Sequence, residues 1–219
     1  MGDFQGVIFD MDGVLVDSEP IFLSAINRLI TNEGVDPVSE EENEEYLLGT
    51  TVELTWERLR EMRQLTAPTK TYIERYDKLV RQVLIEELTP QPGVKRILAE
   101  CVHRRLPRAV ASSSLRSWVH LKLRAIKLSD AFDVVLGGDD VRQGKPNPEI
   151  YRLAAQCLGL PPQSCIAIED SPVGIAAAVG SGAYTIAVRT HFTRNLDISQ
   201  AHLVLDSLEE FDLRLLANG

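Results

Sequence analysis

The sequence is poor in cysteine and histidine and has no long apolar run. Its three cysteines, Cys101, Cys157 and Cys165, are odd in number, and each lies in or beside an apolar helix or strand pattern. This favours buried, reduced thiols in a cytoplasmic protein over a disulfide framework. The four histidines are scattered without metal-ligand spacing, which argues against a zinc site. No apolar run approaches the length of a membrane span, so we expect no membrane partner.

Positive charge is also in deficit. The 219 residues include 23 Lys and Arg against 32 Asp and Glu, which gives a net charge of −9. Nucleic acid is not an expected partner, because binding to a phosphate backbone needs clustered Lys and Arg. A small phosphorylated substrate stays possible, since it needs only local positive charge. With 44% apolar residues the chain can bury a core without disulfides, as one domain or as a core with an insert.

Short β-rich runs alternate with helical patterns along most of the chain. We predict strands at residues 6–10, 108–112, 133–136, 165–169, 184–188 and 203–205, with helices that include 94–101, 115–125, 148–158 and 172–181. The strands are nearly continuous in apolar residues, which is typical of parallel strands buried on both faces. The alternation predicts an α/β fold with a doubly wound parallel sheet. We expect residues 206–219 to form a final surface helix.

The segment from residue 17 to residue 86 shows helical periodicity only and no convincing strand. We therefore predict a core domain of residues 1–16 and 87–219, and an inserted all-helical cap domain of residues 17–86. The Pro-rich stretch 89–93 suits a domain boundary. Within the insert, the acidic cluster 40–45 is interpreted as a solvated helix face. Trp56 is interpreted as a packing residue rather than a ligand-binding one.

Two carboxylates follow the first predicted strand. Asp10 and Asp12 lie two residues apart, so their side chains lean toward the same side of the chain. Two ionised carboxylates this close repel each other unless a cation lies between them. The pair suggests a hard divalent metal, a carboxylate nucleophile beside a general acid, or both. The alternative is that Asp12-Gly13 forms a turn and Asp10 merely ends a strand.

Polar residues follow three further predicted strands. They are the serines 112–114, Lys145 in a Gly-Lys-Pro-Asn-Pro stretch, and the pair Glu169-Asp170. Ligands of doubly wound sheets bind at the carboxyl ends of the strands, so we expect these groups to share one edge with Asp10. Each also has an ordinary interpretation. The serines could cap a helix, Lys145 could be solvated, and the acidic pair could simply end its strand.

These motifs, taken in order, resemble those of the haloacid dehalogenase-like hydrolase superfamily. They are similar to its subgroup with a helical cap, which includes β-phosphoglucomutase and phosphoglycolate phosphatase. The matching stretches are Phe9-Asp10-Met11-Asp12-Gly13-Val14-Leu15-Val16-Asp17-Ser18-Glu19, Ala111-Ser112-Ser113-Ser114, Gly144-Lys145-Pro146-Asn147-Pro148 and Ile168-Glu169-Asp170-Ser171-Pro172-Val173-Gly174. Four ordered motifs at compatible spacing are specific, whereas any single one would be weak.

The resemblance implies a Mg²⁺-dependent phosphatase that acts on a small phosphorylated metabolite, such as a sugar phosphate, through an aspartyl-phosphate. Because the dehalogenases lack a second aspartate two residues on, Asp12 points to phosphate substrates. The implied catalytic residues are Asp10 as nucleophile and Asp12 as general acid and base. The implied phosphate-binding residues are Ser112, Ser113 and Lys145. The implied Mg²⁺ ligands are Asp10, Asp12 through its backbone carbonyl, Glu169 and Asp170.

β-Phosphoglucomutase shares the core motifs and is the main alternative. It carries a cap histidine where this chain has Phe22, and a lysine after its serines where this chain has Leu115. It also has a cap arginine shortly after a glycine, where this chain reads Gly49-Thr50-Thr51-Val52. A mutase must hold two phosphates, so the missing cations favour a phosphatase. A catalytically silent phospho-ligand-binding protein has less support, because every motif position carries its reactive residue. We expect a monomer.

Overall fold

A computed structural model describes residues 3–47, 50–191, 193 and 195–217. The chain forms two compact units, Met1–Asp17 with Thr89–Gly219, and Ser18–Leu88. The boundaries predicted from the sequence differ from this division by one and two residues. The difference at the second boundary has a simple cause, because helix α4 continues to Glu87 before the chain becomes extended at Leu88.

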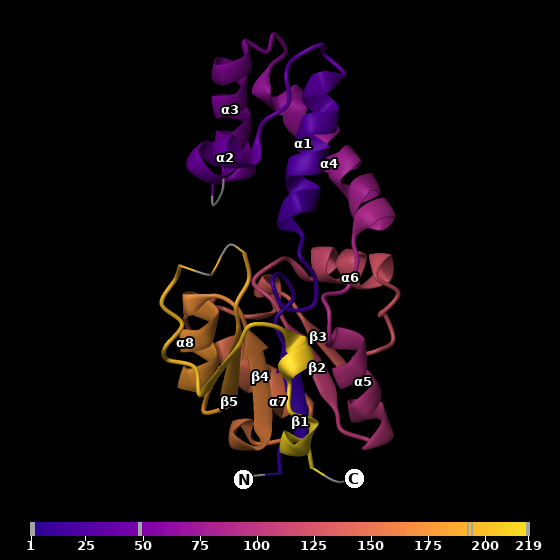
Figure 1. Cartoon of the computed structure of the whole chain (residues 1–219), viewed down its shortest axis with the longest axis vertical. Helices are drawn as coiled ribbons and strands as arrows, with labels where there is room; N and C mark the ends of the chain where they lie inside the picture. Colours follow the sequence, from indigo (N-terminus) through magenta and orange to yellow (C-terminus); the bar gives the residue numbers. More distant parts are fainter. Residues whose placement is uncertain (1–2, 48–49, 192, 194, 218–219) are drawn as a thin grey trace. The chain divides into compact units, whose positions relative to one another are not determined.

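The first unit contains a six-stranded sheet in which all neighbouring strands run parallel, so the predicted α/β fold is confirmed (Figure 1). Its strands are β1 (Gly6–Phe9), β2 (Arg108–Ala111), β3 (Val134–Leu136), β4 (Cys165–Glu169), β5 (Tyr184–Val188) and β6 (Leu203–Leu205). Their spatial order is β3-β2-β1-β4-β5-β6. The chain therefore continues in opposite directions from β1, and the carboxyl ends of β1 and β4 are where sheets of this topology usually bind their ligands.

Four α-helices accompany this sheet: α5 (Val94–His103), α6 (Arg116–Ala125), α7 (Glu149–Cys157) and α8 (Pro172–Ser181). Helix α7 packs on β1, β2 and β3, and α8 packs on β4 and β5. Their common core is rich in alanine from both layers, including Ala109, Ala167, Ala154 and Ala178. Such small side chains let the helices approach the sheet closely, and β1 is buried along its whole length.

The end of the chain does not form the predicted surface helix. It forms two short 3-10 turns, Leu208–Glu210 and Leu213–Leu215. Phe211 and Leu216 are buried, and Arg96 of α5 and Arg104, which directly follows α5, donate hydrogen bonds to carbonyls of this tail. The buried residues Leu208, Phe211 and Leu215 have helical spacing, but the arginine bonds to carbonyls of the tail accompany an irregular segment along α5 instead. Figure 1 shows the two terminal segments side by side, where Phe4 pairs with Leu216.

The described residues of the second unit, Ser18–Leu47 and Thr50–Leu88, form helices joined by turns and loops, with no strand among them. It contains α1 (Glu19–Thr31), α2 (Glu40–Glu42), a π-helical turn (Asn43–Leu47), α3 (Val52–Arg63) and α4 (Thr69–Glu87). Trp56 is fully buried and stacks on Tyr72 at 5.3 Å between ring centroids, so it packs in the core as predicted. Ser39 forms a capping box with Glu42 at the start of the acidic cluster, whose other glutamates are exposed. Gly49, used above in the comparison with the mutase, lies outside the described residues.

The cysteines only partly match the prediction of buried thiols. Cys101 and Cys165 are buried and free, but Cys157 is exposed. Cys157 is the last residue of α7 and follows the exposed Gln156, so its position beside an apolar pattern did not imply burial. Among the described helices, none is both long and apolar enough to cross a membrane.

Candidate active site

Asp10 and Lys145 form the centre of the predicted site. Asp10 directly follows β1, and its backbone N–H donates to the carbonyl of Ile168 on β4. The ammonium group of Lys145 lies 2.6 Å from the Asp10 carboxylate and 2.6 Å from that of Glu169, and donates to the carbonyl of Ala111 at 3.0 Å. The Lys145 side chain is 4% exposed. One buried cation therefore links the carboxyl ends of β1, β2 and β4, which excludes the alternative of a solvated lysine.

Glu169 is held more completely than an ordinary residue at a strand end. Its Oε1 accepts from Lys145 and from the hydroxyl of Tyr151 at 2.7 Å. Its Oε2 accepts from the N–H groups of Asp170 and Ser171 and from the Ser171 hydroxyl. A Cβ at Gly174 would lie 1.9 Å from Oε1, so only glycine lets the first turn of α8 come this close. The sequence motif located Glu169 but did not reveal Tyr151, which lies within the helical pattern of α7.

Asp170 meets the first loop at Gly13. This glycine has a φ of +85°, and an added Cβ would lie 2.1 Å from Asp170 Oδ2. Asp12-Gly13 thus does form a turn, as the alternative interpretation proposed, and the same turn brings the loop against Asp170. Within the part of the chain that the structure describes, Asp10, Glu169 and Asp170 each offer an oxygen within 4.8 Å of the others.

The pKa values of these buried groups diverge. Burial raises the pKa of Asp10 to about 7, although Lys145 opposes this effect. Burial, together with the negative charges of Asp10 and Glu169, raises the pKa of Asp170 to about 8. Burial would also raise the pKa of Glu169, but the charge of Lys145 and the hydrogen bonds from Lys145, Tyr151 and Ser171 together outweigh it and lower that pKa. Lys145 keeps its proton, because the two carboxylates raise its pKa despite its burial.

These groups fit a divalent cation. Three carboxylates gather around one ammonium group, so two negative charges stay uncompensated when all are ionised. Burial and this excess of negative charge both raise the pKa values of Asp10 and Asp170. Mg²⁺ favours hard oxygen ligands and needs only one or two carboxylates. Asp10 and Asp170 are the better candidates, because the Glu169 oxygens already accept hydrogen bonds from several donors.

The Asp12 carboxylate lies outside this cluster. Its Oδ2 accepts from the Ser114 hydroxyl at 3.2 Å, and its Oδ1 forms an ion pair with Lys122 of α6. Its predicted contribution to a metal site, through the backbone carbonyl, stays a prediction. Lys122 was not among the predicted site residues. In the sequence it is one more charged residue within an amphipathic helix.

The serines do not cap α6. The residue that precedes this helix is Leu115, and no side chain caps it. Ser112 is buried and its hydroxyl oxygen accepts from the Ser114 N–H at 3.1 Å. That bond uses an oxygen lone pair, so the hydroxyl hydrogen of Ser112 can still be donated to a ligand. Ser113 is exposed, and its predicted role in phosphate binding stays a prediction.

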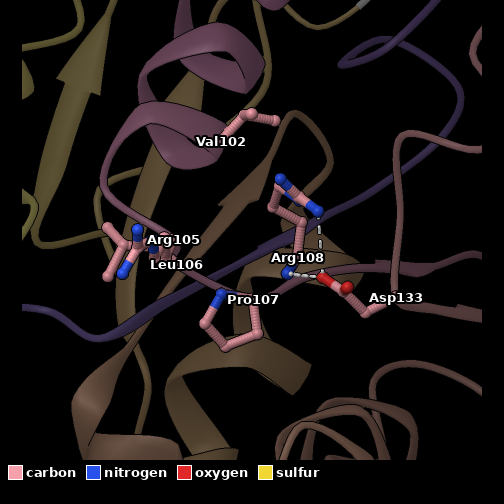
Figure 2. Close-up of a pocket in the computed structure, with 6 residues that line it drawn as sticks. All are labelled: Val102, Arg105, Leu106, Pro107, Arg108 and Asp133. Atoms are coloured by element: carbon pink, nitrogen blue, oxygen red, sulfur yellow. Dashed lines mark hydrogen bonds and ion pairs between the residues drawn. The ribbon is translucent and has the colours of Figure 1, made fainter. Parts of the chain in front are cut away.

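A separate groove lies at the opposite, amino-terminal end of β2 (Figure 2). It has a volume of about 310 Å³, and Val102, Arg105 and Leu106 form one part of its lining. Pro107, Arg108 and Asp133 line the rest, and an ion pair at 3.3 Å joins Arg108 to Asp133. It contains no predicted site residue, and its Arg108 already pairs with a carboxylate.

The melting temperature of the metal-free protein should fall as the pH rises from about 5 to about 8. Asp10 and Asp170 have an ordinary pKa of 3.8, so the unfolded chain has lost both protons in this range while the folded state retains them. Deprotonation therefore favours unfolding until the folded pKa values are passed. Mg²⁺ binds the ionised groups, so its stabilising effect should grow over the same range. Differential scanning fluorimetry with EDTA or Mg²⁺ measures both, and a Mg²⁺ effect largest at pH 5 would contradict the site.

Comparison with known proteins yields a consistent set of relatives. The model of the haloacid dehalogenase-like hydrolases matches residues 7–188. A phosphorylated carbohydrates phosphatase of Thermotoga maritima is 33% identical over 178 residues, which are 81% of this chain and 82% of that protein. CbbY from Rhodobacter sphaeroides, whose structure contains xylulose-(1,5)bisphosphate, is 29% identical in sequence. The alignment covers 98% of this chain and 99% of that chain, with a TM-score of 0.77. The structure of a β-phosphoglucomutase from Clostridium difficile has 25% sequence identity and a TM-score of 0.69, and the alignment covers 96% of this chain and 94% of that chain.

Proposed function

Since this chain belongs to the haloacid dehalogenase-like hydrolases and is a phosphoric monoester hydrolase, we propose that it is a Mg²⁺-dependent phosphatase of small phosphorylated carbohydrates. One observation carries the proposal. The buried Lys145 ammonium lies 2.6 Å from Asp10, at the edge of the sheet where Asp170 also lies. A carboxylate nucleophile, a cation and a metal ligand thus occupy one buried cluster, which is what phosphoryl transfer to an aspartate requires.

The first half of the reaction transfers the phosphoryl group to Asp10. An Asp10 oxygen attacks phosphorus, and the ester P–O bond breaks with its electron pair moving to the leaving oxygen. Lys145 reduces the repulsion between the carboxylate and the phosphate, and the Ser112 hydroxyl donates to a phosphoryl oxygen. Asp12 gives its proton to the leaving oxygen. Such acid catalysis is typically worth about 10²–10⁴-fold.

The second half of the reaction hydrolyses the aspartyl-phosphate and regenerates the free Asp10 carboxylate. Asp12, now a carboxylate, takes a proton from water as the water oxygen attacks phosphorus, and the aspartyl P–O bond breaks. Asp10 and Asp170 would hold Mg²⁺, which supplies positive charge to the phosphoryl oxygens when bound. Glu169 keeps Lys145 in place between β1 and β4. Ser113 lies in the same serine loop as Ser112, and we retain it as a further phosphate-binding candidate.

Purified protein should release phosphate from p-nitrophenyl phosphate in the presence of Mg²⁺, and EDTA should stop the reaction. A panel of hexose, pentose and hexitol phosphates then identifies the substrate. The relatives named above for phosphorylated carbohydrates and for a sugar bisphosphate support this choice of panel. Mg²⁺-independent release, or no release from any ester, would overturn the proposal.

A phosphomutase is the second candidate, because the C. difficile β-phosphoglucomutase shares the fold over nearly the whole chain. The two activities separate in one assay. With glucose 1,6-bisphosphate and β-glucose 1-phosphate, a phosphatase yields inorganic phosphate without net formation of glucose 6-phosphate. Efficient conversion to glucose 6-phosphate would establish the mutase instead.

A further inference from the structure

Helix α6 carries a lysine where its neighbours form the apolar core. Val119 and Leu123 are fully buried, and the Lys122 side chain between them is only 3% exposed. An ammonium group is costly to bury unless a carboxylate or several hydrogen bonds compensate it. The carboxylate that Lys122 meets is that of Asp12, whose side chain is 37% exposed and so open to a ligand.

The two oxygens of Asp12 have different partners. Oδ1 pairs with the Lys122 ammonium, which is a charge-assisted interaction and among the stronger hydrogen bonds in proteins. Oδ2 accepts from the neutral Ser114 hydroxyl at 3.2 Å, a weaker bond that is more easily exchanged. Partners on both oxygens fix the plane of the carboxylate. Because its bond is the weaker one, Oδ2 is the oxygen that can more easily exchange its partner for a ligand.

We infer that Lys122 is a positioning residue, which holds Asp12 so that Oδ2 faces the leaving oxygen. This inference rests on the proposed function. In the transfer step, the O–H bond at Oδ2 breaks and the proton moves to the leaving oxygen as the ester bond breaks. In the hydrolysis step, Oδ2 takes a proton from the attacking water. Lys122 acts only through Asp12.

Esters whose leaving groups differ in their need for a proton test this role of Lys122. p-Nitrophenolate departs readily without a proton, phenolate needs more help, and the alkoxide of β-glycerol phosphate needs the most. Substituting Lys122→Met, which keeps the length of the side chain, should lower kcat/KM for phenyl phosphate and β-glycerol phosphate about tenfold or more. It should lower kcat/KM for p-nitrophenyl phosphate by less than about threefold. A purely structural role would lower all three alike.

Two comparisons complete the experiment. In an Asp12→Asn background, Lys122→Met should cause no further loss with phenyl phosphate, because the group that it positions is gone. Lys95→Met, a change at an exposed lysine of α5, should leave all rates unchanged. If Lys122→Met does not fold, Lys122→Gln removes the charge that pairs with Oδ1 and tests the same selectivity.

Equal losses on the three esters, no loss on any, or additive losses in the Asp12→Asn background would each overturn the role of Lys122. These outcomes leave the proposed function intact, because wild-type protein still hydrolyses p-nitrophenyl phosphate. A wild type that hydrolyses none of the three would overturn the proposed function, and the role of Lys122 with it.

Discussion

Replacing Asp10 with asparagine should abolish phosphate release, with a loss of roughly 10⁴-fold or more, as when other hydrolases lose their nucleophile. The asparagine amide has nearly the same size as the carboxylate but cannot attack phosphorus. The fold should survive, because Lys145 keeps Glu169 as a partner at 2.6 Å. Burial also raises the pKa of Asp10 to about 7, which means that its ionised form is unfavourable in the metal-free protein. A neutral side chain at this position avoids that unfavourable buried charge.

The control for this experiment is Asp130→Asn, a matched change at an exposed aspartate. Steady-state rates with p-nitrophenyl phosphate and thermal unfolding should be measured on both variants. We expect Asp130→Asn to match the wild type in both. An Asp10→Asn variant that melts like the wild type and keeps more than about a tenth of its activity would end the assignment of Asp10 as nucleophile.

Replacing Lys145 with methionine should have the largest effect on stability. The change leaves Asp10 and Glu169 buried without the cation that lies between them. Removal of one partner from a buried ion pair typically costs about 3–5 kcal/mol. Activity should fall as well, because an anionic nucleophile would then meet an anionic phosphate. The loss of stability should shrink at pH 5, where Asp10 takes up a proton and needs no counter-charge.

Urea denaturation at pH 5 and at pH 7.5 measures this effect, with Lys95→Met as the control. Lys122→Met is a second comparison, because its partner Asp12 is partly exposed and water can solvate the carboxylate once the lysine is gone. We expect the order of destabilisation at pH 7.5 to be Lys145, then Lys122, then Lys95. A Lys145→Met variant as stable as the Lys95→Met variant would contradict the buried charge cluster.

The parts of the site that the sequence predicted are those that follow strands. The carboxyl ends of parallel strands lie at one edge of the sheet, so the sequence alone predicts that Asp10, Lys145 and Asp170 lie close together. The adjacent residues Glu169 and Asp170 could not be distinguished. Only the structure shows that Glu169 bonds with Lys145 and Tyr151, while Asp170 faces the first loop.

The residues that the sequence did not reveal lie on helices. A buried lysine and an exposed one both fit the charged positions of an amphipathic pattern. The position of Lys122 depends on how α6 docks on the sheet, which no local pattern specifies. The contact of Tyr151 with Glu169 could not be predicted for the same reason, because it depends on how α7 packs on the sheet. The chain's end was wrongly predicted because Arg96 and Arg104 bind the carbonyls of Phe211 and Leu216, a contact between segments distant in sequence.

The central claim is that Asp10 itself carries the phosphoryl group between the two half-reactions. Wild-type protein should be mixed with Mg²⁺ and p-nitrophenyl phosphate, quenched in acid within milliseconds and reduced with borohydride, which converts an aspartyl-phosphate to homoserine. Peptide mass spectrometry should find homoserine at position 10, and should find none there without substrate. Steady turnover with Asp10 unmodified in every quenched sample, or with the label on another residue, would contradict the claim.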